Sequence, residues 1–109
     1  MKSTQNLYLW EAWIDKQVIG SQPLNMLYVV GEVFADKKSN PTLVKKTQTH
    51  PGQLHLEIVA PRTSLANIEE VYFSEVLQKD CPYKEILVFS NNALVAAIKE
   101  IETLETVHA

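Results

Sequence analysis

The chain has 109 residues, a mass of 12.4 kDa, 46% apolar residues and a formal net charge of −3. This length predicts one domain over residues 1–109, with residues 1–5 and 107–109 expected to fray. The apolar content and the small numbers of glycine and proline, 3 and 5, exclude disordered, collagen-like and low-complexity classes.

Charge is distributed unevenly along the chain. Residues 1–66 carry seven basic and five acidic residues, whereas residues 67–109 carry three basic and eight acidic residues. Such asymmetry is typical of solvated faces and, less often, of a partner surface. Because phosphate recognition needs clustered lysine and arginine, an acidic chain of this kind predicts no nucleic-acid partner.

Cysteine usage and hydropathy indicate the compartment. Cys81 is the only cysteine, so no intramolecular disulfide can form. No apolar run approaches the roughly 18 residues of a membrane span, and the apolar residues 7–10 are interrupted at once by Glu11. We therefore expect a cytoplasmic protein that does not associate with membranes.

The first predicted element is a strand over residues 6–14, with a short helix as its rival. Alternation would place Trp10, Ala12 and Ile14 on one face and Glu11 and Trp13 on the other. Gly20, Ser21 and Pro23 then predict a loop over residues 15–25.

Residues 26–35 form the clearest strand pattern in the chain. They are nearly all apolar, which predicts a central strand covered on both faces. Gly31 within this run indicates either a bulge or a close approach of another group to the backbone.

Residues 42–60 predict a β-hairpin. His50-Pro51-Gly52-Gln53 is typical of a type II turn, because proline suits its second position and glycine its third. A hairpin closed there would place Lys46 opposite Glu57, and Leu54, Leu56 and Ile58 would share one face.

Three further runs follow. Residues 68–77 favour a strand over a helix, and residues 84–90 predict a strand. Residues 93–107 fit both a helix and a strand, and Asn91-Asn92 before them suits either a helix N-cap or a tight hairpin turn.

Together these elements predict an all-β fold, a single antiparallel β-sandwich or open barrel of about 6–7 strands. The alternative is an α+β fold in which residues 93–106 form a C-terminal helix packed on the sheet.

The strongest candidate ligand-binding group consists of aromatic and acidic residues in the first two strands. Aromatic rings beside a carboxylate can bind sugars or cations, although core packing is the commoner role of such rings. Glu32, which interrupts an apolar strand, could act as a general acid or base if it is desolvated, or it could lie in solvent. The full group is Trp10, Glu11, Trp13, Tyr28 and Glu32.

A second candidate is a basic patch formed by Lys37, Lys38, Lys45 and Lys46. It could dock an acidic partner, or it could protect an edge strand from association. His50, His55 and Glu57 resemble metal ligands, but a zinc site needs three or four convergent ligands, so we expect no metal and no cofactor.

Two function classes remain. No glycine-rich phosphate loop, nucleophile elbow or zinc-protease motif is present, and no histidine partner can be assigned to Cys81. This favours a non-enzymatic binding module that uses a sheet face or edge to hold a protein partner or a second copy of itself. The alternative is a small-ligand carrier or small enzyme with a pocket lined by Trp10, Trp13, Tyr28 and Glu32.

Overall fold

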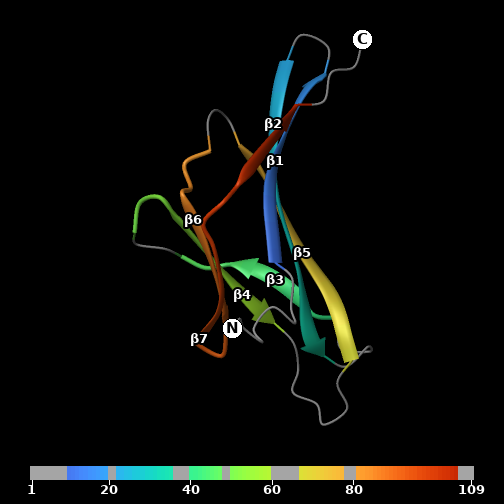
Figure 1. The fold of residues 1–109 in the computed structure, drawn as a ribbon, viewed down its shortest axis with the longest axis vertical. Coiled ribbons are helices and arrows are strands. Elements are labelled where there is room, and N and C mark those ends of the chain that lie inside the picture. The colour runs from blue at the N-terminus through green and yellow to red at the C-terminus, as the bar shows by residue number, and fades with distance from the viewer. Residues whose placement is uncertain are drawn as a thin grey trace, which may run out of the picture.

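The computed structural model describes residues 10–19, 22–35, 40–47, 50–59, 67–77 and 81–105. These residues form eight strands and contain no helix, so the predicted all-β class is confirmed (Figure 1). The strands are β1 (Trp10–Ile19), β2 (Gln22–Ala35), β3 (Thr42–Lys45), β4 (Gln53–Val59), β5 (Asn67–Leu77), β6 (Glu85–Ser90), β7 (Ala93–Ile98) and β8 (Glu102–Glu105).

The strands make two four-stranded sheets that share one core. Sheet A has the order β5-β2-β1-β8 and sheet B the order β3-β4-β6-β7. The prediction of purely antiparallel pairing is wrong, because both sheets are mixed. β1 pairs parallel to β8, and β4 pairs parallel to β6. The chain leaves sheet B after β4, forms β5 in sheet A and returns to sheet B, so that β6 runs alongside β4 in the same direction.

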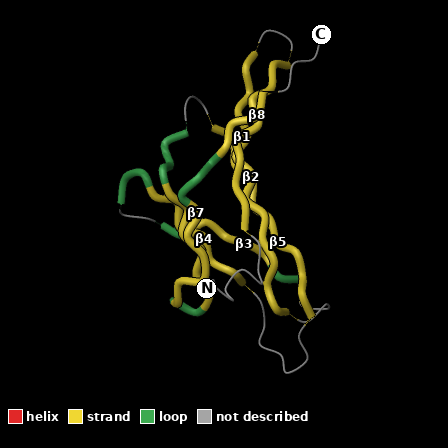
Figure 2. Tube along the Cα trace, in the orientation of Figure 1, coloured by secondary structure: helices red, strands yellow, loops and turns green. Residues whose placement is uncertain are grey.

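The molecule is elongated because β1 and β2 are long. Its principal extents are 50 × 31 × 29 Å. The end of the β1–β2 hairpin that carries β8 extends past sheet B (Figure 2). The predicted loop over residues 15–25 was too long, since β1 continues to Ile19 and β2 already begins at Gln22.

The core lies between the inner faces of the two sheets. In β2, Leu27 and Val29 are fully buried, while Tyr28 and Val30, which alternate with them, are half-buried. β2 is therefore central in its sheet, as predicted, but only one of its faces is covered by sheet B. Sheet B contributes fully buried Leu54, Leu56, Ile86 and Val88. Each such side chain stabilises the fold by about 1.5–3 kcal/mol.

The predicted β3–β4 hairpin forms with a different register. Gly52 has φ +82° and the Gln53 amide donates to the His50 carbonyl at 3.3 Å, which confirms the turn. However, Lys45 pairs with Leu56, two residues away from the predicted register. A shift of two keeps every side chain on its face, so the burial of Leu54 and Leu56 was still predicted correctly.

The C-terminal run forms strands, so the alternative helix over residues 93–106 is wrong. Asn91 and Asn92 have φ values of 52° and 67°, the left-handed pair of a two-residue hairpin turn that joins β6 to β7. A register shift follows, in which Val88 pairs with Ala96 but Phe89 with Leu94. The β-bulge breaks the simple alternation that a strand template expects.

Candidate functional site

The two faces of sheet A separate the aromatic and acidic residues singled out in the sequence. Trp10 lies opposite Gly31 on the core side and packs against the buried cluster. Trp13 and Tyr28 lie on the opposite side, which we call the outer face of sheet A, together with Glu11 and Glu32. The structure therefore brings four of the five residues onto one face and places Trp10 behind them.

Trp13 and Tyr28 form an aromatic pair at the centre of the outer face. They are direct cross-strand partners between β1 and β2. Their ring centroids are 5.6 Å apart with an interplanar angle of 28°, which is a stacked arrangement. Both rings are half-buried, so part of each π surface remains available for contact.

Carboxylates surround this aromatic pair. Among the residues that the structure describes, the outer face of sheet A carries five acids and no lysine or arginine. Glu32 on β2 lies directly opposite Glu70 on β5, a like-charged cross-strand pair that by itself costs stability. The five acids are Glu11, Asp15, Glu32, Glu70 and Glu102.

Large apolar side chains that the sequence reasoning did not select extend the same face. Tyr72 is 71% exposed, Val76 56%, Ile68 54% and Leu104 49%. Tyr72 neighbours Val30, and Val76 neighbours Met26. The strand predicted over residues 68–77 could have indicated that Ile68, Tyr72 and Val76 share one face, because even-numbered residues of a strand point to the same side. It does not show which of the two faces is covered, because both carry apolar residues.

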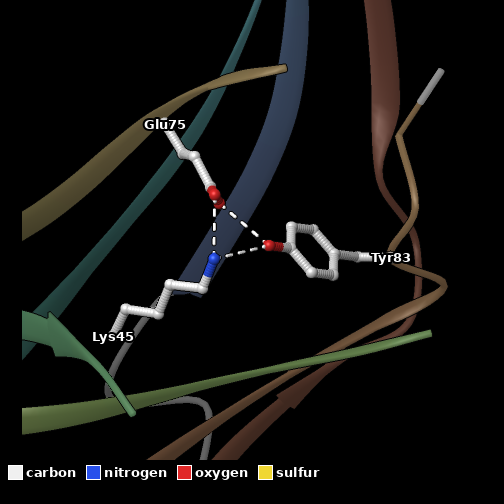
Figure 3. A network of polar contacts seen from close by, with 3 residues as sticks. All are labelled: Lys45, Glu75 and Tyr83. Atoms are coloured by element: carbon white, nitrogen blue, oxygen red, sulfur yellow. Dashed lines mark hydrogen bonds and ion pairs between the residues drawn. The ribbon is translucent and has the colours of Figure 1, made fainter. Parts of the chain in front are cut away.

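The two described lysines of the basic candidate point to opposite faces of sheet B. The Lys45 Nζ donates to the Glu75 Oε2 at 2.9 Å and to the Tyr83 Oη at 3.0 Å, and the Tyr83 hydroxyl donates to the Glu75 Oε1 at 3.0 Å (Figure 3). The Lys46 Nζ instead lies 3.5 Å from the Glu57 Oε1 and 4.8 Å from the centroid of the Phe89 ring. Lys37 and Lys38 fall outside the described residues.

The network of Lys45, Glu75 and Tyr83 joins β3 of sheet B to β5 of sheet A. The hydrogen bond to the Glu75 carboxylate raises the pKa of Lys45 above its ordinary value. Burial raises the pKa of the Tyr83 phenol, with the hydrogen bond from Lys45 acting in the opposite direction. Both partners of Glu75 are therefore held in their protonated form at neutral pH, as a structural link requires.

The histidine and cysteine candidates have ordinary surroundings. The ring centroids of His55 and Phe89 are 5.3 Å apart, and the His55 Nε2 is 3.0 Å from the Gln53 Oε1. In the described part of the chain, no three His, Cys, Asp or Glu side chains gather closely enough to hold a metal ion. Burial raises the pKa of the Cys81 thiol, whose Sγ donates to the Tyr83 carbonyl at 3.5 Å, so the thiolate is disfavoured.

Chemically, the outer face of sheet A is suited to binding. It offers stacked rings, exposed apolar side chains and carboxylates on an extended sheet surface.

No helix that could span a membrane occurs in the described ranges. No family model, no curated protein and no solved structure matches this chain.

Proposed function

We propose that this protein is a non-enzymatic binding module whose outer face of sheet A holds a cationic partner. The observation that carries the proposal is the composition of that face, which combines exposed apolar and aromatic side chains with five carboxylates and, in its described part, no basic residue. Exposed apolar side chains gathered on one face of a small protein are typical of an interaction surface.

The Glu32–Glu70 pair supports the proposal that the partner is positively charged. Two carboxylates directly opposite each other on neighbouring strands repel in the free protein. A lysine or arginine placed between them would relieve this repulsion on binding. The gain would appear mainly as faster association and greater selectivity, because rim charges steer encounter more than they add affinity.

The aromatic pair supports the same conclusion. Trp13 and Tyr28 present ring surfaces at the centre of the face, and an ammonium or guanidinium group over such a ring is attracted by about 0.5–2 kcal/mol.

The same rings, with Glu32, also favour a second candidate function, a carrier of a small cationic ligand. That candidate needs only this part of the face, whereas a protein partner would also contact Tyr72 and Val76.

The cytosol is the compartment that we propose for this module. Its support is the single thiol, Cys81, which allows no stabilising intramolecular disulfide.

The proposal is tested by nuclear magnetic resonance titration of the labelled protein with two peptides. One peptide alternates lysine and leucine, and the other alternates glutamate and leucine. We expect shifts only with the lysine peptide, centred on the Trp13 indole and the Tyr72 amide, with little change at the core-facing Trp10 indole. Binding confined to Trp13 and Tyr28 by a free alkylammonium ion, with none by the peptide, would favour the small-ligand carrier.

A matched pair of variants separates the proposed face from general charge. Glu32→Gln/Glu70→Gln removes two charges from the outer face, and Glu57→Gln/Glu100→Gln removes two charges elsewhere. We expect the first to weaken binding of the lysine peptide roughly tenfold, which corresponds to about 1.4 kcal/mol, and the second to have little effect. An equal loss in both variants would show that the peptide responds only to net charge.

A further inference from the structure

The four edge strands of the two sheets differ in how well they are protected against pairing with another chain. β3 and β8 have four residues each, and β7 has six with a β-bulge opposite Val88 and Phe89. β5 has eleven residues, contains no proline or lysine, and pairs with β2 over its whole length without a register shift. Short strands, bulges, lysine and proline are common protections of a sheet edge, and β5 has none of these four. Its own protection consists of three glutamates, of which Glu69 and Glu75 lie on the core side.

We propose that β5 pairs antiparallel with β5 of a second copy of this chain, about a twofold axis at Tyr72. Among the described strands β5 is hydrogen-bonded only to β2. β3 of sheet B packs against β5, with the Lys45–Glu75 ion pair between them, but forms no ladder with it. The edge of β5 away from β2 is therefore the one at which a partner strand would add. The two copies of sheet A would then form one continuous eight-stranded sheet. Twofold dimers are the commonest closed assemblies, and strand addition supplies backbone hydrogen bonds without new side chains.

The outer face of β5 is self-complementary in this register. Residues whose numbers add to 144 would lie opposite each other, which places Tyr72 opposite the partner's Tyr72. Ile68 would then face Val76 of the partner subunit, and Glu70 would face the partner's Ser74. Tyr72, Val76 and Ile68 are each more than half exposed in the single chain, so the pairing would bring two apolar pairs and one aromatic pair into lateral contact and cover part of their surface.

The core side of β5 is compatible with the same register because of Lys45. Glu69 would lie opposite Glu75 of the partner subunit, which would otherwise be a repulsive pair. Glu75 already binds Lys45, whose ammonium uses two of its three donors for Glu75 and Tyr83 and keeps a side-chain exposure of 42%. The third donor can reach the incoming carboxylate, which converts the contact into a shared ion pair.

Charge distinguishes this edge-to-edge dimer from face-to-face association. Stacking two outer faces would oppose five acids with five acids, with no described basic residue between them. Pairing through β5 leaves both outer faces exposed and joins them side by side. The dimer shares Tyr72 and Val76 with the proposed binding face, but it does not rest on the binding of a cationic partner, and its test needs no partner.

The first test is sedimentation equilibrium of the purified chain over a concentration series. We expect a species of twice the 12.4 kDa chain mass to form as concentration rises. Tyr72→Lys, at a position 71% exposed, should weaken the dimer at least tenfold, whereas Leu94→Lys, 55% exposed on β7, should leave it unchanged. A wild-type chain that stays monomeric, or equal dissociation by both variants, would overturn the proposal.

The second test reads the register directly and does not depend on the lysine variant folding. In a Cys81→Ser background, Tyr72→Cys places two cysteines opposite each other at the axis, within the Cα spacing that a disulfide needs. Val76→Cys places its two copies about 27 Å apart in the same dimer. We expect oxidation to link Tyr72→Cys chains rapidly and Val76→Cys chains not at all; the reverse result, or linkage of neither, would refute this interface.

Discussion

Gly31 and Trp10 show how a single residue determines the packing of the N-terminal strand. The two are cross-strand partners, and a Cβ added at Gly31 would overlap carbon atoms of the Trp10 indole. The sequence suggested either a bulge or a close approach at this glycine, and the second is what the structure shows, because β2 has no register shift there. Glycine is tolerated in this strand interior since the ring occupies the space that a side chain would need.

Gly31→Ala should lower the free energy of unfolding by about 1–3 kcal/mol, the usual cost of overpacking a filled core. Urea denaturation of the variant measures this loss. The control is the same substitution in a Trp10→Ala background, where the ring is absent and alanine should cost nothing or stabilise the strand slightly. An equal loss in both backgrounds would show that the cost comes from the backbone and not from the indole.

At the scale of elements, the β6–β7 hairpin depends on two consecutive left-handed residues. Asn91 and Asn92 both have positive φ, and the strands continue directly from Ser90 and Ala93. Asparagine and glycine adopt this conformation at low cost, whereas for alanine the left-handed conformation is unfavourable by about 1–2 kcal/mol. The sequence allowed Asn91-Asn92 to be either a helix N-cap or a hairpin turn, and in the structure the two residues form the hairpin turn.

Asn92→Ala should lower the free energy of unfolding by about 1 kcal/mol, and Asn92→Gly should leave it unchanged or raise it slightly. Thermal denaturation followed by circular dichroism compares the two variants. Because both variants remove the same side chain, the difference between them isolates the backbone requirement. A loss of similar size in both would instead point to the asparagine amide group.

At the scale of the whole molecule, Lys45, Glu75 and Tyr83 connect the two sheets. The raised pKa values of Lys45 and Tyr83 mean that both bind their proton more tightly in the folded state. Their contribution to stability is therefore complete below their ordinary values of 10.5 and 10.0, and it is lost as pH rises through the higher folded-state values. The network favours folding at neutral pH and weakens in alkali.

The difference in unfolding free energy between the wild type and Lys45→Met/Tyr83→Phe should shrink steadily above about pH 10. Urea denaturation at pH 8, 10 and 11 measures this difference. At neutral pH, Glu75→Gln should cost about 1 kcal/mol, because the network is partly exposed, and Glu57→Gln, whose 3.5 Å ion pair lies within sheet B, should cost less. A pH-independent difference would show that packing alone links the sheets.

Local patterns predicted the class and most of the elements. Alternation identified the inner and outer residues of β1 and β4, and Pro51-Gly52 identified the turn, because these depend on neighbours in the sequence. The same alternation already placed Trp10 and Trp13 on different faces, so the proposed pocket that contained both was inconsistent with its own strand assignment. The core between the sheets confirms the alternation.

Long-range pairing decided what remained. The register of β3 on β4 differs by two residues from the predicted one. Such a shift leaves every side chain on its face, so alternation could not distinguish the two registers. The parallel pairs β1–β8 and β4–β6 join segments far apart in the chain, and no local signal specifies them. The union of Trp13, Tyr28 and Tyr72 on one acidic face likewise depends on which strands become neighbours.

The sequence by itself thus determined the all-β class, the turn at residues 50–53 and the inward-facing residues of the clearest strands, since period and turn chemistry are local properties. Only the tertiary structure decided the two-sheet order, the separation of Lys45 from Lys46, the position of β5 at the edge of sheet A and the assembly of the outer face. The physical reason is that each of these features depends on contacts between strands that are distant in the sequence. Such strands come together where their apolar faces can be buried against one another.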